Sequence, residues 1–251
     1  VGNATWDPRL AIRRGNAGSR RAQQVPTYGR PSSDYYYGLL DDAADVAAPE
    51  LIVGRIPALT EEESRNHVSK IIAMDTADIG SWIRRWLFVG GGVEQEGLCD
   101  IYQNLLDDPF QSGITFTDQP LCLDTTTVCG YREGSSSGYV IKQALDRGLQ
   151  WMNYIGHGAT DQFDIRGWEP SELLPSANFG VLATYACQTG AFSNPSVACK
   201  NADYLTTPNV GFAAAVGGTG WARIVTINYL HYRIHELLRG TSIRTLGDLI
   251  Y

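Results

Sequence analysis

Two apolar runs that each stop at a reactive residue most strongly constrain how this chain of 251 residues can fold. The first run, residues 151–155, leads into Gly156-His157-Gly158, and the second, residues 179–186, leads into Cys187. A short apolar run bounded by glycine is typical of a strand buried in a parallel sheet. Because chemistry gathers at the carboxyl ends of the strands in an open α/β sheet, we expect the imidazole and the thiol to lie at the same edge.

Other segments of the chain alternate between strand-like and helix-like patterns. Apolar runs that end at glycine turns predict strands at residues 49–57, 86–89 and 210–216. Thr60 and Glu63 match a capping box and predict a helix that runs to about Met74. Two further helices are expected at residues 135–148 and 225–238. This alternation indicates an α/β fold with a mostly parallel central sheet flanked by helices.

The composition limits the class of partner. The formal net charge is -7 and the sequence pI is near 5.1, whereas nucleic-acid-binding domains are normally basic, so we expect no nucleic-acid partner. No apolar stretch reaches the length of a transmembrane helix, so no membrane span is expected.

The chain has the length of one α/β domain with two subdomains. Val1-Gly2-Asn3-Ala4 resembles the end of a strand, so we expect a fragment truncated at the N-terminus.

The cysteines leave several pairings open. The chain has five, so at least one thiol is outside any disulfide: Cys99, Cys122, Cys129, Cys187 and Cys199. If Cys187 is that thiol, Cys122 and Cys129 are the best placed local pair, because they flank a threonine-rich turn at residues 124–127. A fully reduced set is an equal alternative. No cysteine pair has zinc-finger spacing, and His231 and His235 lack the HExxH pattern, so no zinc site is expected.

A thiol beside an imidazole can act as a nucleophile. The histidine accepts the thiol proton and later donates it to the leaving amine. The backbone N–H groups of Gly158 and Cys187 are candidates for an oxyanion hole. Taken singly, a cysteine at the end of a strand is also compatible with an inert buried residue. The order of the two blocks along the chain therefore carries more information than either block alone.

These blocks resemble a clan of cysteine peptidases that contains caspases, legumain, clostripain and gingipains. Residues 153–158 resemble the catalytic histidine block of the gingipain-type peptidases, and residues 186–192 resemble their nucleophile block. The segments 1–8, 35–38 and 49–57 also resemble this family. The caspase signature itself does not fit, because Gln-Thr-Gly follows Cys187.

The resemblance implies a caspase-like three-layer sandwich and a secreted or cell-surface bacterial cysteine endopeptidase that acts on proteins or peptides. His157 would be the general acid/base, Cys187 the nucleophile, and Gly158 a donor to the oxyanion. Residues 1–85 would form a partial N-terminal subdomain and residues 86–251 the catalytic subdomain. The chemistry itself would require no cofactor.

Further residues are assigned only through this resemblance. Glu94, with Glu96 next to it, is the candidate acid that orients the histidine. Asp100 is a candidate for an acidic pocket that selects Arg or Lys, although it is equally suited to start a helix. Trp221 resembles a pocket tryptophan, with loop packing as the alternative. Some relatives bind calcium, and three residues without strict ligand spacing offer oxygens for it: Asp41, Asp42 and Asp45.

Two alternative functions remain. A sortase-like transpeptidase of a bacterial secretion system would form the same thioester and pass it to an amine, so the sequence does not separate transfer from hydrolysis. A non-catalytic surface module that kept the fold is the third possibility. The presence of both His157 and Cys187 argues against this module.

Overall fold

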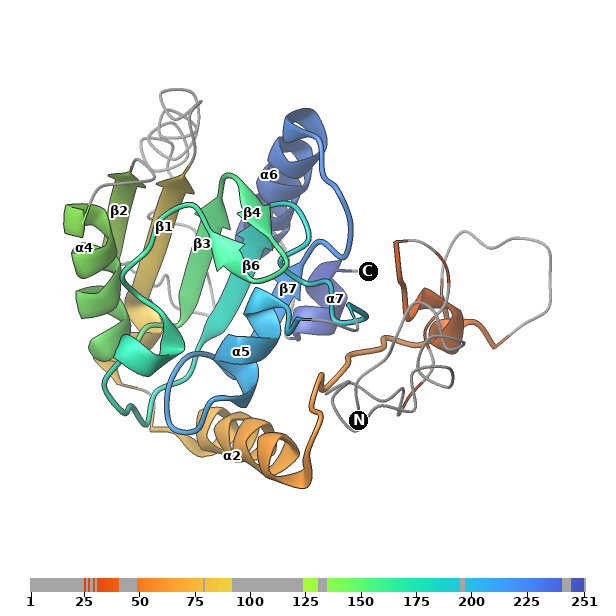
Figure 1. Ribbon diagram of the computed structural model, residues 1–251, viewed down its shortest axis with the longest axis horizontal. Coiled ribbons are helices and arrows are strands. Elements are labelled where there is room, and N and C mark those ends of the chain that lie inside the picture. Colours follow the sequence, from red (N-terminus) through yellow and green to blue (C-terminus); the bar gives the residue numbers. More distant parts are fainter. Residues whose placement is uncertain are drawn as a thin grey trace.

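A parallel sheet of five strands forms the centre of the protein in this computed structural model (Figure 1). The structure describes Val25, Thr27, Gly29 and residues 31–40, 49–78, 80–91, 124–130, 135–194, 197–240 and 245–250. The strand order is β2-β1-β3-β6-β7, and every neighbouring pair is parallel. The strands are β1 (Arg85–Gly91), β2 (Asp124–Gly130), β3 (Trp151–Ile155), β6 (Val181–Tyr185) and β7 (Ala214–Gly217).

Helices flank this sheet. The α-helices are α2 (Glu61–Thr76), α4 (Ser135–Asp146), α5 (Lys200–Thr206), α6 (Ile224–Gly240) and α7 (Leu246–Ile250). The 3-10 helices among the described residues are η1 (Tyr35–Gly38), η2 (Ser81–Arg84) and η4 (Pro170–Glu172). A small antiparallel pair, β4 (Gly158–Ala159) and β5 (Gln162–Phe163), follows β3 directly. None of the described helices is long and apolar enough to cross a membrane.

The sheet is buried on both faces, which explains its continuous apolar strands. Leu87 and Val89 of β1 belong to a cluster that includes Ile141 of α4 and Leu205 of α5. On the opposite face, alternate residues of the same strands pack with α6 and α7, as Trp86, Phe88, Ile227, Ile234 and Leu249. Burying each of these large side chains stabilises the fold by about 1.5–3 kcal/mol. The helix–sheet–helix arrangement confirms the predicted three-layer α/β fold.

The helix at residue 60 starts where the capping box predicts. Thr60 Oγ1 accepts a hydrogen bond from the backbone N–H of Glu63 at 3.1 Å. The Glu63 carboxylate accepts one from the N–H of Leu59 at 2.6 Å, one residue earlier than in the standard box. The resulting helix α2 runs to Thr76, two residues beyond Met74.

Residues 49–57 were predicted as a buried strand, and this prediction is wrong. The side chains of Leu51 and Ile52 are 48% and 52% exposed, so this segment does not bury its apolar residues in the sheet. The segment is held by polar contacts instead. Gly38 O accepts hydrogen bonds from the N–H groups of Glu50 and Leu51.

Two further local predictions need correction. Residues 124–127 form part of strand β2 and not a turn, so the geometry on which the Cys122–Cys129 disulfide depended is not present. The strand expected at residues 210–216 begins only at Ala214, because Gly211 has a φ of 82° and breaks the extended backbone. Cys99 and Cys122 lie outside the described residues, and Cys199 carries a buried thiol beside Ala191 and Ala202.

Candidate active site

His157 and Cys187 lie beyond the carboxyl ends of two neighbouring strands. Ile155 of β3 pairs with Tyr185 of β6 in parallel register, and each reactive residue follows two positions later. Both residues line one small cavity of about 60 Å³, together with Gly91, Gly156, Ala222, Ile224 and Ile227. His157 is exposed and Cys187 is half-buried. The structure therefore brings together the two residues that the sequence pattern singled out.

The thiol of Cys187 is held against the loop that follows β7. The backbone N–H of Ala222 donates to Cys187 Sγ at 3.3 Å, and the thiol lies 3.5 Å from the Ala222 carbonyl oxygen. The next residue, Gln188, has a φ of 58°, which is an unfavourable backbone conformation for a residue other than glycine. Its N–H donates to Gly220 O at 2.9 Å. Three contacts with one loop thus fix the turn at Cys187.

A buried polar cluster closes the base of this turn. Thr184 on β6 and Thr189 after Cys187 share a hydrogen bond of 2.7 Å between their hydroxyl oxygens. Asn201 Nδ2 on α5 donates to Thr184 Oγ1 at 3.1 Å. All three side chains are buried, so each bond is made in a low-dielectric setting where losing a partner is costly. The cluster links the end of β6 to the segment after Cys187.

Tyr154 supports the backbone at His157, and sequence reasoning missed this residue. Its hydroxyl donates to the carbonyl oxygen of His157 at 2.7 Å and accepts from the N–H of Asp164 at 3.1 Å. Burial raises the pKa of Tyr154 well above its ordinary value, so the hydroxyl stays protonated and remains a donor. A tyrosine inside a buried strand needs a polar partner, and that requirement was the available signal.

The glycines around His157 allow close backbone approach. A Cβ at Gly156 would lie 2.4 Å from the carbonyl oxygen of Gly91 at the end of β1. A Cβ at Gly158 would lie 2.8 Å from Thr189 Cγ2 and 3.2 Å from the carbonyl oxygen of Cys187. The backbones of Gly158 and Cys187 are therefore neighbours, which is what a shared oxyanion hole requires.

Trp221 lies beside the catalytic cavity but does not line it. Its side chain is 85% exposed, so it does not pack the loop as the structural alternative required. It lines a second cavity of about 500 Å³ together with Gln188. The other predicted site residues lie outside the described residues: Glu94, Asp100, Asp41, Asp42 and Asp45. Among the residues whose placement is described, no group of three or more His, Cys, Asp or Glu side chains is arranged to hold a metal ion.

The remaining histidines are structural. His67, His231 and His235 are buried, and none of them lines the cavity of His157. Asn153 of β3 hydrogen-bonds His235 Nε2 at 2.6 Å, and burial lowers the pKa of His235 to about 4, so this ring is neutral at physiological pH.

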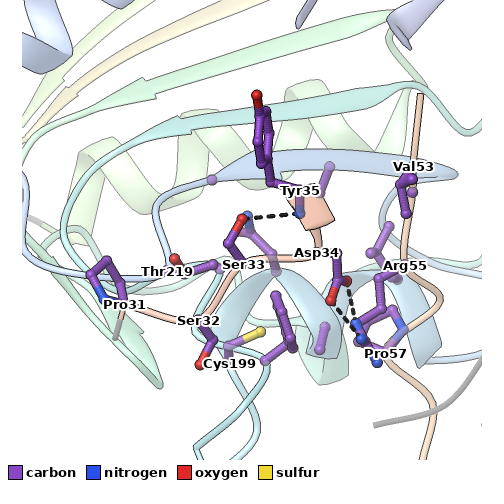
Figure 2. A pocket seen from close by; sticks show the side chains of 18 residues that line it. Pro31, Ser32, Ser33, Asp34, Tyr35, Val53, Arg55, Pro57, Cys199 and Thr219 are labelled. Atoms are coloured by element: carbon purple, nitrogen blue, oxygen red, sulfur yellow. Dashed lines mark hydrogen bonds and ion pairs between the residues drawn. The ribbon is translucent and has the colours of Figure 1, made fainter. Parts of the chain in front are cut away.

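The largest of these cavities, about 540 Å³, lies between the N-terminal segment (residues 31–40 and 49–57) and β7 (Figure 2). Asp34 and Arg55 form an ion pair in its wall, with Arg55 Nη2 at 2.7 Å from Asp34 Oδ1. The Arg55 guanidinium also stacks over the ring of Phe192 at 4.7 Å. These contacts fasten the N-terminal segment to the loop that follows Cys187. Neither His157 nor Cys187 lines this cavity.

Solved structures with the same fold include two of one gingipain. The Arg specific cysteine proteinase gingipain R (RGPB) matches with a TM-score of 0.70 and 17% identity, over 96% of this chain and 59% of that one. The complex of Porphyromonas gingivalis RgpB pro- and mature domains matches with a TM-score of 0.67 and 17% identity, over 87% and 53%. A structure described as a protease matches with a TM-score of 0.62 and 16% identity, over 85% and 45%.

These likenesses show the fold. The chain spans about half the length of the solved structures that it matches. No curated protein sequence gives a significant match. A family match covers the whole chain, residues 1–251, and is described as Peptidase family C25. It confirms the expected gingipain-type relationship, and the chain belongs to peptidase family C25.

Proposed function

We propose that the protein is a cysteine-type endopeptidase in which Cys187 is the nucleophile and His157 the general acid/base. One observation carries the proposal: the two side chains line the same small cavity at the carboxyl ends of adjacent parallel strands. A thiol and an imidazole at one sheet edge are the minimum equipment for acyl transfer through a thioester. Membership of a peptidase family supports the same reaction.

The first half of the reaction forms the acyl-enzyme. His157 accepts the proton of the Cys187 thiol, and Sγ attacks the carbonyl carbon of the scissile peptide bond. The N–H groups of Gly158 and Cys187 donate to the resulting oxyanion. The tetrahedral intermediate collapses when the imidazolium gives its proton to the leaving amine and the C–N bond breaks. The substrate carboxyl side is then a thioester on Cys187.

The second half releases the product. His157 accepts a proton from water, and the hydroxide oxygen attacks the thioester carbonyl carbon. The C–S bond breaks, and Sγ recovers its proton from His157. If an amine takes the place of water, the same thioester yields a transpeptidation product. Adding an amine to the assay and identifying the products by mass spectrometry separates the two outcomes.

Selection of the substrate residue is the next part of the proposal. Asp100 would supply the acidic wall of the primary pocket and favour Arg or Lys, while Trp221 would cover that pocket and Glu94 would orient His157. One matched structure is titled Arg specific, which supports a basic preference here. Calcium would bind at Asp41, Asp42 and Asp45 and would serve structure, not chemistry.

Membership of the peptidase family supports a proposal on where the protein acts and on what. We propose a secreted or cell-surface bacterial protein whose partners are protein or peptide substrates. Residues 1–85 would form the N-terminal subdomain and residues 86–251 the catalytic subdomain.

An active-site label tests the proposal directly. The protein is treated with an Arg or Lys peptidyl chloromethyl ketone, digested and mapped by mass spectrometry. We expect the label on Cys187. Modification of Cys199 or another cysteine in place of Cys187 would contradict the nucleophile assignment. Equal labelling by an uncharged analogue would contradict only the preference for Arg or Lys.

A further inference from the structure

A second cavity lies directly beyond the wall that bounds the catalytic cavity. Consecutive residues line different cavities: Cys187 and Ala222 face the small one, whereas Gln188 and Trp221 face the second one, of about 500 Å³. Adjacent residues of the enzyme, whose Cα atoms are about 3.8 Å apart, line the two cavities, so the cavities are neighbours. A peptide whose scissile bond lies at Sγ would therefore reach the second cavity within about two residues. A cavity of this volume is in the usual range for a ligand site.

The lining of this cavity is polar but uncharged. None of the described residues that line it has a side chain that ionises near neutral pH. It presents the half-buried amide side chains of Gln188 and Asn194 beside the exposed indole of Trp221. An ionised substrate side chain would meet no counter-charge there, whereas an uncharged side chain would find hydrogen-bond partners and an aromatic surface.

The N-terminal segment forms part of this cavity. Ser32 Oγ and Ser193 Oγ are 2.6 Å apart in a buried hydrogen bond. Pro31 lies against the loop after β7, since a Cβ at Gly220 would be 2.8 Å from Pro31 Cβ. The Asp34–Arg55 ion pair, in the wall of the 540 Å³ cavity, holds the same segment in place (Figure 2). The cavity is therefore walled by four separate parts of the chain, which favours a fixed shape.

We infer that this cavity is a specificity subsite that binds one uncharged side chain of the substrate, within about two residues of the scissile bond. The inference rests on the proposed function, since it needs Cys187 to mark the bond that is cut. It assigns substrate selection to Asn194, which lines the second cavity and not the catalytic one. Uncharged polar and aromatic residues are the class of side chain that fits its lining.

A charge placed in the subsite provides the test. Asn194→Asp keeps the shape of the side chain and adds one negative charge to a half-buried position. The matched control is Asn209→Asp, which makes the same change at an exposed residue after α5. Each protein digests a proteome-derived peptide library, and the cleavage sites are read by mass spectrometry.

We expect Asn194→Asp to enrich Lys and Arg about fivefold at one single position near the cleaved bond. The parent should prefer uncharged residues at that position, and Asn209→Asp should keep the parent profile. If Asn194→Asp cleaves the library with the parent profile, the inference is overturned while the proposed function stands. If Cys187→Ala cleaves as the parent does, the proposed function itself fails.

A second variant tests the same cavity without adding a charge, and it serves if Asn194→Asp fails to fold. Asn194→Trp fills the cavity with an uncharged side chain and should shift the same position toward glycine and alanine. Ile72→Trp, at a 56% exposed position on α2, is its control. An unchanged profile in Asn194→Trp would overturn the inference in the same way.

Discussion

The hydroxyl of Tyr154 donates a hydrogen bond to the backbone carbonyl oxygen of His157 at 2.7 Å, from a fully buried side chain in β3. The same hydroxyl accepts from the N–H of Asp164. Tyr154→Phe removes both bonds and leaves a donor and an acceptor without their partner, which costs about 1–3 kcal/mol. We expect the unfolding free energy to fall by that amount, and kcat for peptide cleavage to fall about tenfold because His157 is no longer held.

Urea unfolding and steady-state kinetics measure the two effects. Tyr229→Phe, at a 72% exposed position on α6, is the matched control and should change neither quantity. A Tyr154→Phe enzyme with the kcat of the parent would show that the hydroxyl does not position the histidine.

Gly156 fits a site where no side chain is tolerated. A Cβ there would lie 2.4 Å from the carbonyl oxygen of Gly91, which is backbone and cannot rotate away. Gly156→Ala should lower the unfolding free energy by about 3 kcal/mol, because β1 and β3 must separate to relieve the clash. Gly54→Ala is the control, since a Cβ at Gly54 meets nothing within 4 Å. Equal stability of the two variants would contradict this packing.

Lys70 predicts a pH dependence of stability. The residue is buried on α2, its Nζ donates to Tyr204 O at 2.7 Å and to Val210 O at 2.6 Å, and burial lowers its pKa to about 7. In the unfolded chain the pKa is near 10.5. Between these values the unfolded state binds one more proton, so the Lys70 contribution to stability rises with pH by about 1.4 kcal/mol per unit.

Comparison with Lys70→Met isolates this effect from other titrations. The unfolding free energy of the parent minus that of the variant should increase by about 2 kcal/mol between about pH 7.5 and 9. Below the folded-state pKa the difference should be flat. A difference that stays constant across the alkaline range would mean that Lys70 keeps its proton in the folded protein.

The sequence predicts the central strands well and the edge of the sheet poorly. Strands β1 and β3 are buried on both faces, so their residues form continuous apolar runs that stand out in the sequence. Strand β2 begins Asp124-Thr125-Thr126-Thr127 and pairs with β1 at one end of the strand order, where polar side chains are tolerated. Residues 49–57 gave the opposite error. Their apolar pattern predicted a buried strand, but Leu51 and Ile52 remain about half exposed.

The candidate active site was also predictable only in part. The meeting of His157 and Cys187 was predictable, because parallel neighbouring strands end at one edge. The contact between Ala222 and the thiol was not, because it depends on how a loop 35 residues further along the chain folds back over β6. The cavity beyond Trp221 was also beyond sequence reasoning, since Pro31, Thr160 and Asn194 meet there only in three dimensions.

The most direct test of the account compares two cysteine variants of the purified protein in a peptide-cleavage assay. Cys187→Ala removes the thiol in the catalytic cavity, and Cys199→Ala removes a buried thiol outside it. We expect Cys187→Ala to lose at least about 10³-fold in kcat, and Cys199→Ala to stay within about threefold of the parent. Cleavage by Cys187→Ala at the rate of the parent would contradict the central claim.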